Sequence, residues 1–89
     1  MLVTKMRHDG EYFFLAESVD QDELERDIIT AVQAGGGFVR FDTRGHGRVS
    51  VLMAANFPVR FESVERSEAE VASWEDKPPS IDVDPDSYL

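Results

Sequence analysis

The sequence contains no cysteine, which excludes disulfide bridges, thiolate zinc sites and cysteine nucleophiles. It also has no apolar run near the ~18 residues that a membrane-spanning helix needs. Its opening segment, MLVTKMRHDG, lacks the basic and then apolar layout of a secretory signal peptide. We therefore expect a cytoplasmic protein that does not associate with membranes.

Groups able to perform catalysis or to bind metal are also scarce. His8 and His46 both lie beside glycine in predicted turns, and nothing pairs either of them with a nucleophile. The glycines at 35–37 follow a predicted helix, whereas phosphate-binding glycine loops precede one. The alternating acids at 82–86 lack the central glycine and the closing glutamate of a calcium-binding loop. The sequence thus predicts a non-enzymatic protein without a cofactor or a metal.

Charge divides the chain into two parts. The 89 residues carry 18 acids and nine bases, a net charge of −9. Residues 1–61 hold nine acids and seven bases, whereas residues 62–89 hold nine acids and two bases. This asymmetry predicts a folded body over residues 1–66 and an acidic, proline-containing tail over residues 67–89.

The body opens with a predicted β-hairpin. Two short alternating runs flank Asp9-Gly10, a dipeptide favoured in two-residue hairpin turns. This turn fixes a register in which Met6 and Phe13 share an inward face. On the opposite face of the pleat the same register pairs Lys5 with Phe14 and Arg7 with Tyr12.

An amphipathic helix is predicted next, from about Gln21 to Ala34. Asp20 is placed as its N-cap and Glu23 completes a capping box. The glycines at 35–37 end it. Its apolar stripe consists of Leu24, Ile28, Ile29, Ala31 and Val32.

Three strands complete the body. The runs 38–43 and 48–53 flank a three-residue loop, which pairs Val39 with Val51, Phe41 with Val49 and Asp42 with Arg48. A fifth strand, 59–64, begins after Pro58 with Val59 and Phe61 facing inward. The sequence therefore predicts an α+β fold of order ββαβββ, a mostly antiparallel sheet with one helix on one face.

The body resembles small actinobacterial or actinophage domains of unknown activity. These have an opening hairpin, an acid-capped helix, a glycine break and a closing β-meander. The matching features are VDQDEL at 19–24, the glycines at 35–37, Val51, and FESVE at 61–65. The resemblance covers residues 2–65. It implies a ββαβββ layout in a bacterial or phage protein and no particular activity.

The sheet face opposite the helix carries the strongest functional signal. This basic-aromatic face displays Lys5, Arg7, Tyr12, Phe14, Phe38, Arg40, Arg48, Leu52 and Arg60, against only Asp42 and Glu62. Such surfaces are typical of protein-binding hot spots and of platforms that stack single-stranded nucleic acid. A third interpretation is that the basic stems only shield the rings from water. The apolar patch and the acidic net charge favour a protein partner or a second copy.

The tail contains a second capping-box pattern. Ser67 and Glu70 form it, and Val71 and Trp74 follow at helical spacing, so we expect a short helix and then a disordered segment. One hypothesis is that Trp74 folds back on the basic-aromatic face, of this chain or of another molecule, and competes with its ligand. The alternatives are a disordered solubilising tail and a linear motif at 81–89 that adds to the sheet edge of a partner.

These patterns predict a small protein-binding or adaptor module that acts through the basic-aromatic face and the tail residue Trp74, with self-association as one form of that binding. Two alternatives remain open. One is a single-stranded nucleic-acid-binding module that uses the same face. The other is an acidic mimic of DNA that inhibits a DNA-binding protein and presents Asp20, Asp22, Glu23, Asp27 and the tail.

Overall fold

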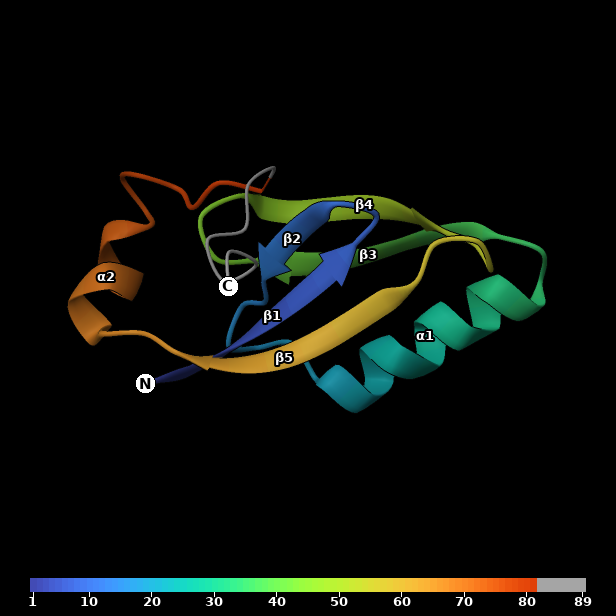
Figure 1. Ribbon diagram of the computed structural model, residues 1–89, viewed down its shortest axis with the longest axis horizontal. Coiled ribbons are helices and arrows are strands. Elements are labelled where there is room, and N and C mark those ends of the chain that lie inside the picture. The colour runs from blue at the N-terminus through green and yellow to red at the C-terminus, as the bar shows by residue number, and fades with distance from the viewer. Residues whose placement is uncertain (82–89) are drawn as a thin grey trace.

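The computed structural model describes residues 1–81 of the chain (Figure 1). The elements within them are β1 (Leu2–His8), β2 (Glu11–Phe14), α1 (Gln21–Gln33), β3 (Gly37–Thr43), β4 (Gly47–Met53), β5 (Val59–Glu65) and α2 (Glu68–Ser73). The strands pair antiparallel throughout, and the predicted α+β fold of order ββαβββ is confirmed. Among these residues no helix is both long and apolar enough to cross a membrane.

Over the described residues the strands form two sheets. One has the order β2-β1-β5 and the other is the β3-β4 ribbon. They meet at one corner, where Leu15 bridges Thr43 and the amide of Arg44 donates to the carbonyl of Phe14 at 2.8 Å. The ribbon therefore turns away from the three-stranded sheet and does not extend it as a flat surface, as Figure 1 shows.

The predicted hairpin registers are confirmed. Asp9 and Gly10 have φ values of 47° and 84°, the positive values that a type I′ turn requires. The turn pairs Met6 with Phe13 and Arg7 with Tyr12. In the ribbon the structure pairs Val39 with Val51, Phe41 with Val49 and Asp42 with Arg48.

Local signals also set the limits of α1. The carboxylate of Asp20 accepts a hydrogen bond from the amide of Glu23 at 3.2 Å, which is the predicted N-cap. At the other end Gly35 has a φ of 92° and its amide donates to the carbonyl of Val32 at 3.0 Å. The amide of Gly36 reaches the carbonyl of Ala31 at 2.9 Å. These two bonds form a Schellman motif, which ends the helix at Gln33.

A first hydrophobic core lies between α1, the ribbon and one face of the three-stranded sheet. Helix α1 packs on β3 and β4. Ile29 was predicted in the apolar stripe, but 55% of it is exposed because it points away from the sheets. The buried residues of this core are Met6, Phe13, Leu15, Leu24, Ile28, Val39, Phe41 and Met53, with Val59, Phe61 and Ile81 packed at its margin.

A second core lies on the other face of the three-stranded sheet. It is built from Val3, Tyr12, Phe14 and Trp74, the last of which caps α2. The rings of Phe14 and Trp74 stack with centroids 4.5 Å apart and an interplanar angle of 23°. Ser67 accepts the predicted N-cap bond from the amide of Glu70 at 3.1 Å. The three-stranded sheet is therefore covered on both faces, and Trp74 folds back on the Tyr12 and Phe14 face of its own chain, as one hypothesis for the tail held.

Candidate functional site

The structure divides the predicted basic-aromatic face into two separate surfaces. One part lies on the three-stranded sheet, on the side that faces α2, and comprises Lys5, Arg7, Tyr12, Phe14 and Arg60. The other part lies on the outer side of the ribbon and comprises Phe38, Arg40, Arg48 and Leu52. The two surfaces are separate because β3 hydrogen-bonds to the segment that follows β2 only at the corner between the sheets. The pleats of the two sheets are therefore not continuous.

The first of these surfaces is not open. Lys5, Tyr12 and Phe14 are 0%, 3% and 4% exposed, and Trp74 is 6% exposed. The expectation that Lys5, Tyr12 and Phe14 form part of an accessible docking surface is therefore wrong, and the tail residue Trp74, also predicted to bind a partner, is buried against them. Its physical cause is α2 and the residue that caps it, because Val71 and Trp74 cover the rings and remove them from water.

The segment 74–81, which we call the strap, crosses from α2 to the edge of β2. It passes over the loop between β3 and β4, where a ring nitrogen of His46 lies 2.5 Å from the carbonyl oxygen of Pro79. A Cβ atom on Gly45 would lie 2.9 Å from both the Cδ of Pro79 and the carbonyl oxygen of Trp74. Further along, the amide of Tyr12 donates to the carbonyl of Ile81 at 3.0 Å. These contacts hold the chain after the short helix against the body as far as residue 81, and the rest of the segment predicted to be disordered, residues 82–89, lies outside the described residues.

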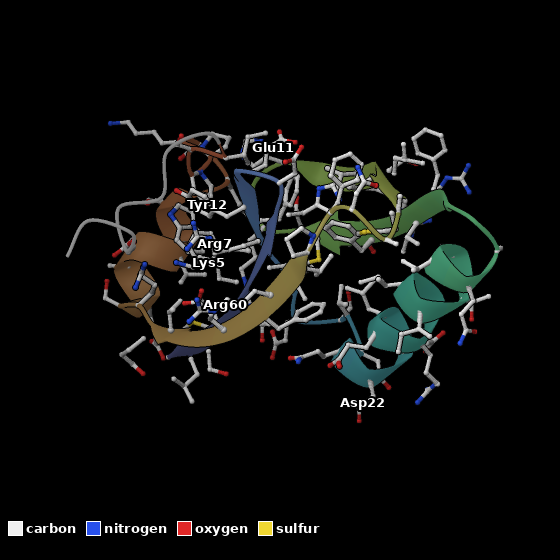
Figure 2. All side chains as sticks on the ribbon, turned by 45° about the vertical axis from the view of Figure 1, so that its right-hand side comes forward. Lys5, Arg7, Glu11, Tyr12, Asp22 and Arg60 are labelled. Atoms are coloured by element: carbon white, nitrogen blue, oxygen red, sulfur yellow. The ribbon has the colours of Figure 1, made fainter. Side chains whose placement is uncertain are left out.

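Cations gather beside the second core. Figure 2 shows Lys5, Arg7 and Arg60 near Tyr12 on the α2 side of the sheet, and we call these three bases the cationic cluster. Arg7 lies directly opposite Arg60 across the β1-β5 pair, and Lys5 lies opposite Glu62. The Nζ of Lys5 lies 5.6 Å from the centroid of the Tyr12 ring. Arg60 forms an ion pair with Glu62 at 3.2 Å. On these strands Glu62 is the acid beside the three bases, and Lys5 and Arg7 take part in further interactions within the chain.

The outer face of the ribbon remains open. Phe38 and Leu52 are cross-strand partners and are 68% and 44% exposed. Arg48 donates from Nε to the carboxylate of Asp42 at 2.9 Å. This hydrogen bond, together with the charge of Arg48, holds the pKa of Asp42 below its usual value, and the same contact raises the pKa of Arg48. Arg40 is exposed on this face without an ion-pair partner among residues 1–81.

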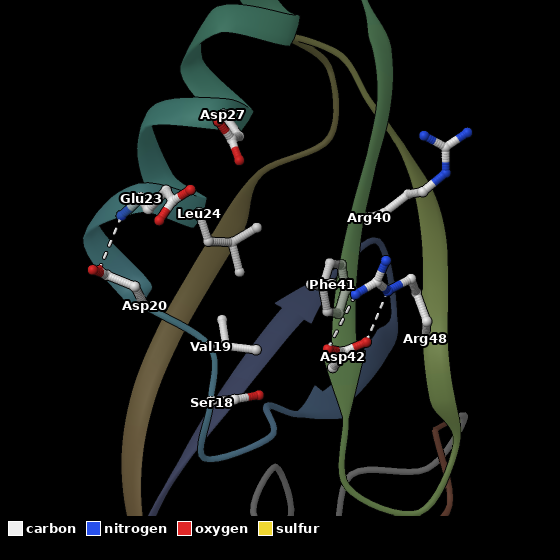
Figure 3. Close-up of a pocket in the computed structure, with 10 residues that line it drawn as sticks. All are labelled: Ser18, Val19, Asp20, Glu23, Leu24, Asp27, Arg40, Phe41, Asp42 and Arg48. Atoms are coloured by element: carbon white, nitrogen blue, oxygen red, sulfur yellow. Dashed lines mark hydrogen bonds and ion pairs between the residues drawn. The ribbon is translucent and has the colours of Figure 1, made fainter.

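A shallow groove of about 190 Å³ separates the start of α1 from β3 (Figure 3). Asp20, Glu23 and Asp27 line its helix side, and Arg40 and Arg48 line its ribbon side. Two of the predicted binding residues therefore face a groove that the sequence analysis missed, since only the packing of α1 on β3 brings these acids and bases together. The carboxylate of Asp20 is already used as the helix cap.

The groove is lined by acids, two arginines, apolar residues and one serine. No histidine lies among its lining residues. Within residues 1–81 no group of three or more histidines and acids comes together as metal ligands do. His8 is buried at 6% exposure beside Phe57, with ring centroids 5.4 Å apart, and packs as part of the interior.

Comparison with protein-family models, with curated proteins and with solved structures finds no match to this chain. The surfaces of the molecule are therefore what bears on its function.

Proposed function

We propose that this protein is a small, non-enzymatic protein-binding module that docks through the outer face of the β3-β4 ribbon and the adjacent edge of β4. The observation that carries the proposal is the exposed cross-strand pair of Phe38 and Leu52. Apolar side chains paired across two strands form a contiguous patch, and such patches on small domains mark sites of association.

The edge of β4 supplies the backbone part of this surface. Within the described residues β4 pairs with β3 on one side and with no strand on the other. From Val49 to Met53 it contains neither a charge nor a proline. Natural edge strands usually carry such residues to prevent pairing with other chains. A strand that lacks them is suited to accept an extended segment of a partner by β-strand addition.

The side chains of the ribbon indicate the chemistry of that segment. An added strand would place alternate side chains on the outer face, next to Leu52 and Phe38. Arg40 offers a positive charge nearby that has no ion-pair partner among residues 1–81, whereas Arg48 is paired with Asp42. We therefore infer a partner segment that alternates apolar residues with at least one carboxylate. We place this activity in the cytoplasm, in keeping with the cysteine-free sequence.

The burial of the other aromatic residues favours a protein partner over nucleic acid. Stacking on bases requires exposed rings, and Tyr12 and Phe14 are buried under Trp74. Phe38 is then the single ring of the predicted face that is exposed among the described residues. One exposed ring offers little surface for stacking, and the negative net charge of the chain repels a polyanion. Both favour an apolar protein segment as the ligand.

Selection of peptides provides the test. A library of random twelve-residue peptides is selected on the wild-type chain, and selected peptides are titrated into isotope-labelled protein. We expect sequences that alternate apolar and acidic residues, and amide shifts centred on β4. Phe38→Ser combined with Leu52→Ser should weaken their binding about tenfold or more, because hot-spot side chains each contribute at least ~1–2 kcal/mol.

The matched control is Ile29→Ser, which removes an exposed apolar side chain from α1 and should leave peptide affinity unchanged. Shifts centred away from β4, or equal affinity for the double variant, would refute the proposal. Binding of single-stranded oligonucleotides to this face would also refute the proposal if their affinity falls steeply with salt, since that dependence reports phosphate contacts.

A further inference from the structure

The outer face of the ribbon is organised in rows that run across its two strands. Residues directly opposite each other in an antiparallel pair share a face, so each outward residue of β4 continues a row that begins on β3. The row of Leu52 begins with Phe38, and the row of Ser50 begins with Arg40. A strand added beside β4 would extend each of these rows by one side chain.

Ser50 makes its row different from the rows on either side. Its neighbours on the outer face of β4 are Arg48 and Leu52, which have long side chains. Ser50 is exposed and short, so a gap over it joins Arg40 to the far edge of β4. Two strand spacings amount to about 10 Å, a distance that an extended arginine and a glutamate can span together.

The charge of Arg40 lies at the inner end of this gap. Arg40 is exposed and has no ion-pair partner among residues 1–81. It borders the groove beside α1, but Figure 3 shows its guanidinium group on the β4 side, away from Asp27. In the next row Arg48 is already bonded to Asp42. A carboxylate placed beyond Ser50 would therefore face an arginine that is available to bind it.

We propose that the ribbon selects partner segments that carry glutamate two residues after an apolar residue, and that Arg40 binds the glutamate across Ser50. The inference rests on the proposed docking by β-strand addition at β4 and specifies its partner. Antiparallel pairs are more stable per residue than parallel ones, so the added segment runs opposite to β4 and meets Leu52 before Ser50. A second copy of β4 would not fit, because its outward residues Arg48, Ser50 and Leu52 include no acid.

Reversal of the charge at Arg40 tests the assignment. The library of random twelve-residue peptides is selected on the wild-type chain and on Arg40→Glu. We expect the wild type to enrich glutamate two positions after an apolar residue, and Arg40→Glu to enrich lysine or arginine there. Replacing this glutamate by glutamine in a selected peptide should weaken binding to the wild type about twofold to fivefold, as for an exposed ion pair. The same replacement should not weaken binding to Arg40→Glu.

Arg26→Glu is the matched control, because it makes the same change of charge at an exposed arginine on α1. It should enrich the same peptides as the wild type. Peptides that shift β4 but show no acid at this position, or show it two positions before the apolar residue, would overturn the inference and leave β-strand addition intact. Peptides whose amide shifts lie away from β4 would overturn the proposed function, and this inference with it.

Two substitutions at Ser50 test the gap itself. Ser50→Leu fills it with a side chain, whereas Ser50→Ala removes only the hydroxyl group. Ser50 is exposed, so neither change disturbs a core. We expect Ser50→Leu to bind peptides at β4 without the preference for glutamate, and Ser50→Ala to keep that preference. Loss of the preference in both variants, or in neither, would overturn the role given to Ser50.

Discussion

At the scale of single residues, Trp74 determines whether one face of the three-stranded sheet is buried or exposed. Its indole stacks on Phe14, whose ring also meets Tyr12 edge-on with centroids 5.6 Å apart. Arg66 adds its guanidinium 5.7 Å from the centre of the Phe14 ring. Without Trp74 these rings would face water. The single side chain that caps α2 thus converts a sheet surface into a core.

Trp74→Ala should therefore destabilise the fold strongly. Removing a buried tryptophan costs about 3–5 kcal/mol through lost burial and the cavity that remains. Because small domains have only ~5 kcal/mol or slightly more in total, we expect a large fall in the urea midpoint, measured by circular dichroism. Trp74→Phe, which keeps an aromatic ring on Phe14, should lose much less. A loss below about 1 kcal/mol for the alanine variant would mean that the stack contributes little.

At the scale of elements, the hairpin loop between β3 and β4 serves as a support for the strap. Gly45 and Gly47 both have positive φ values, 90° and 66°. At Gly45 an added Cβ would collide with the strap, whereas at Gly47 nothing lies within 4 Å. The two glycines therefore separate the cost of backbone strain from the cost of losing contact with the strap.

Gly45→Ala should destabilise the protein more than Gly47→Ala. Both variants carry the strain of alanine at positive φ, about 1 kcal/mol, but the first also displaces Pro79 and the backbone of Trp74. The amide of Tyr12, which donates to Ile81, should then exchange with solvent faster in Gly45→Ala alone. Equal stability and equal exchange in the two variants would contradict this role for the loop.

At the scale of the whole molecule, one three-stranded sheet separates two cores. The first core receives α1 and the ribbon, and the second receives α2 and Trp74. A chain of 89 residues buries only about 60–65% of its unfolded surface, so neither core is large. The acidic C-terminal segment therefore contributes to the folded structure, because its Trp74 completes the second core. The same segment also carries much of the negative charge.

Removal of residues 67–89 should uncover the second core. Val3, Tyr12 and Phe14 would become exposed apolar surface on a body of much lower net charge, which favours aggregation. We expect increased binding of the dye ANS and a lower Tm. Removal of residues 82–89 alone leaves Trp74 in place and is the control for the second core. If the longer truncation changed neither dye binding nor Tm, the second core would be dispensable.

Much of the local structure follows from short-range rules in the sequence. The Asp9-Gly10 turn fixes a register, and the caps at Asp20 and Ser67 start two helices. Each of these signals depends on a few adjacent residues whose φ values or side-chain acceptors favour one conformation. The registers also placed Lys5, Arg7, Tyr12 and Phe14 correctly on one face of the pleat.

The order of the strands and the access to each face were decided by tertiary packing. Alternation along a strand shows which side chains share a face, but it does not show what covers that face. The β3-β4 ribbon turns at the Leu15–Thr43 corner, and Trp74 closes over Phe14. Both contacts join residues that are far apart in sequence. They form because the free energy gained by burial outweighs the entropy lost in closing a long loop. No short-range pattern in the sequence encodes that balance. The sequence therefore determined the faces of this protein, and the tertiary structure determined that one is sealed while Phe38 and Leu52 remain exposed.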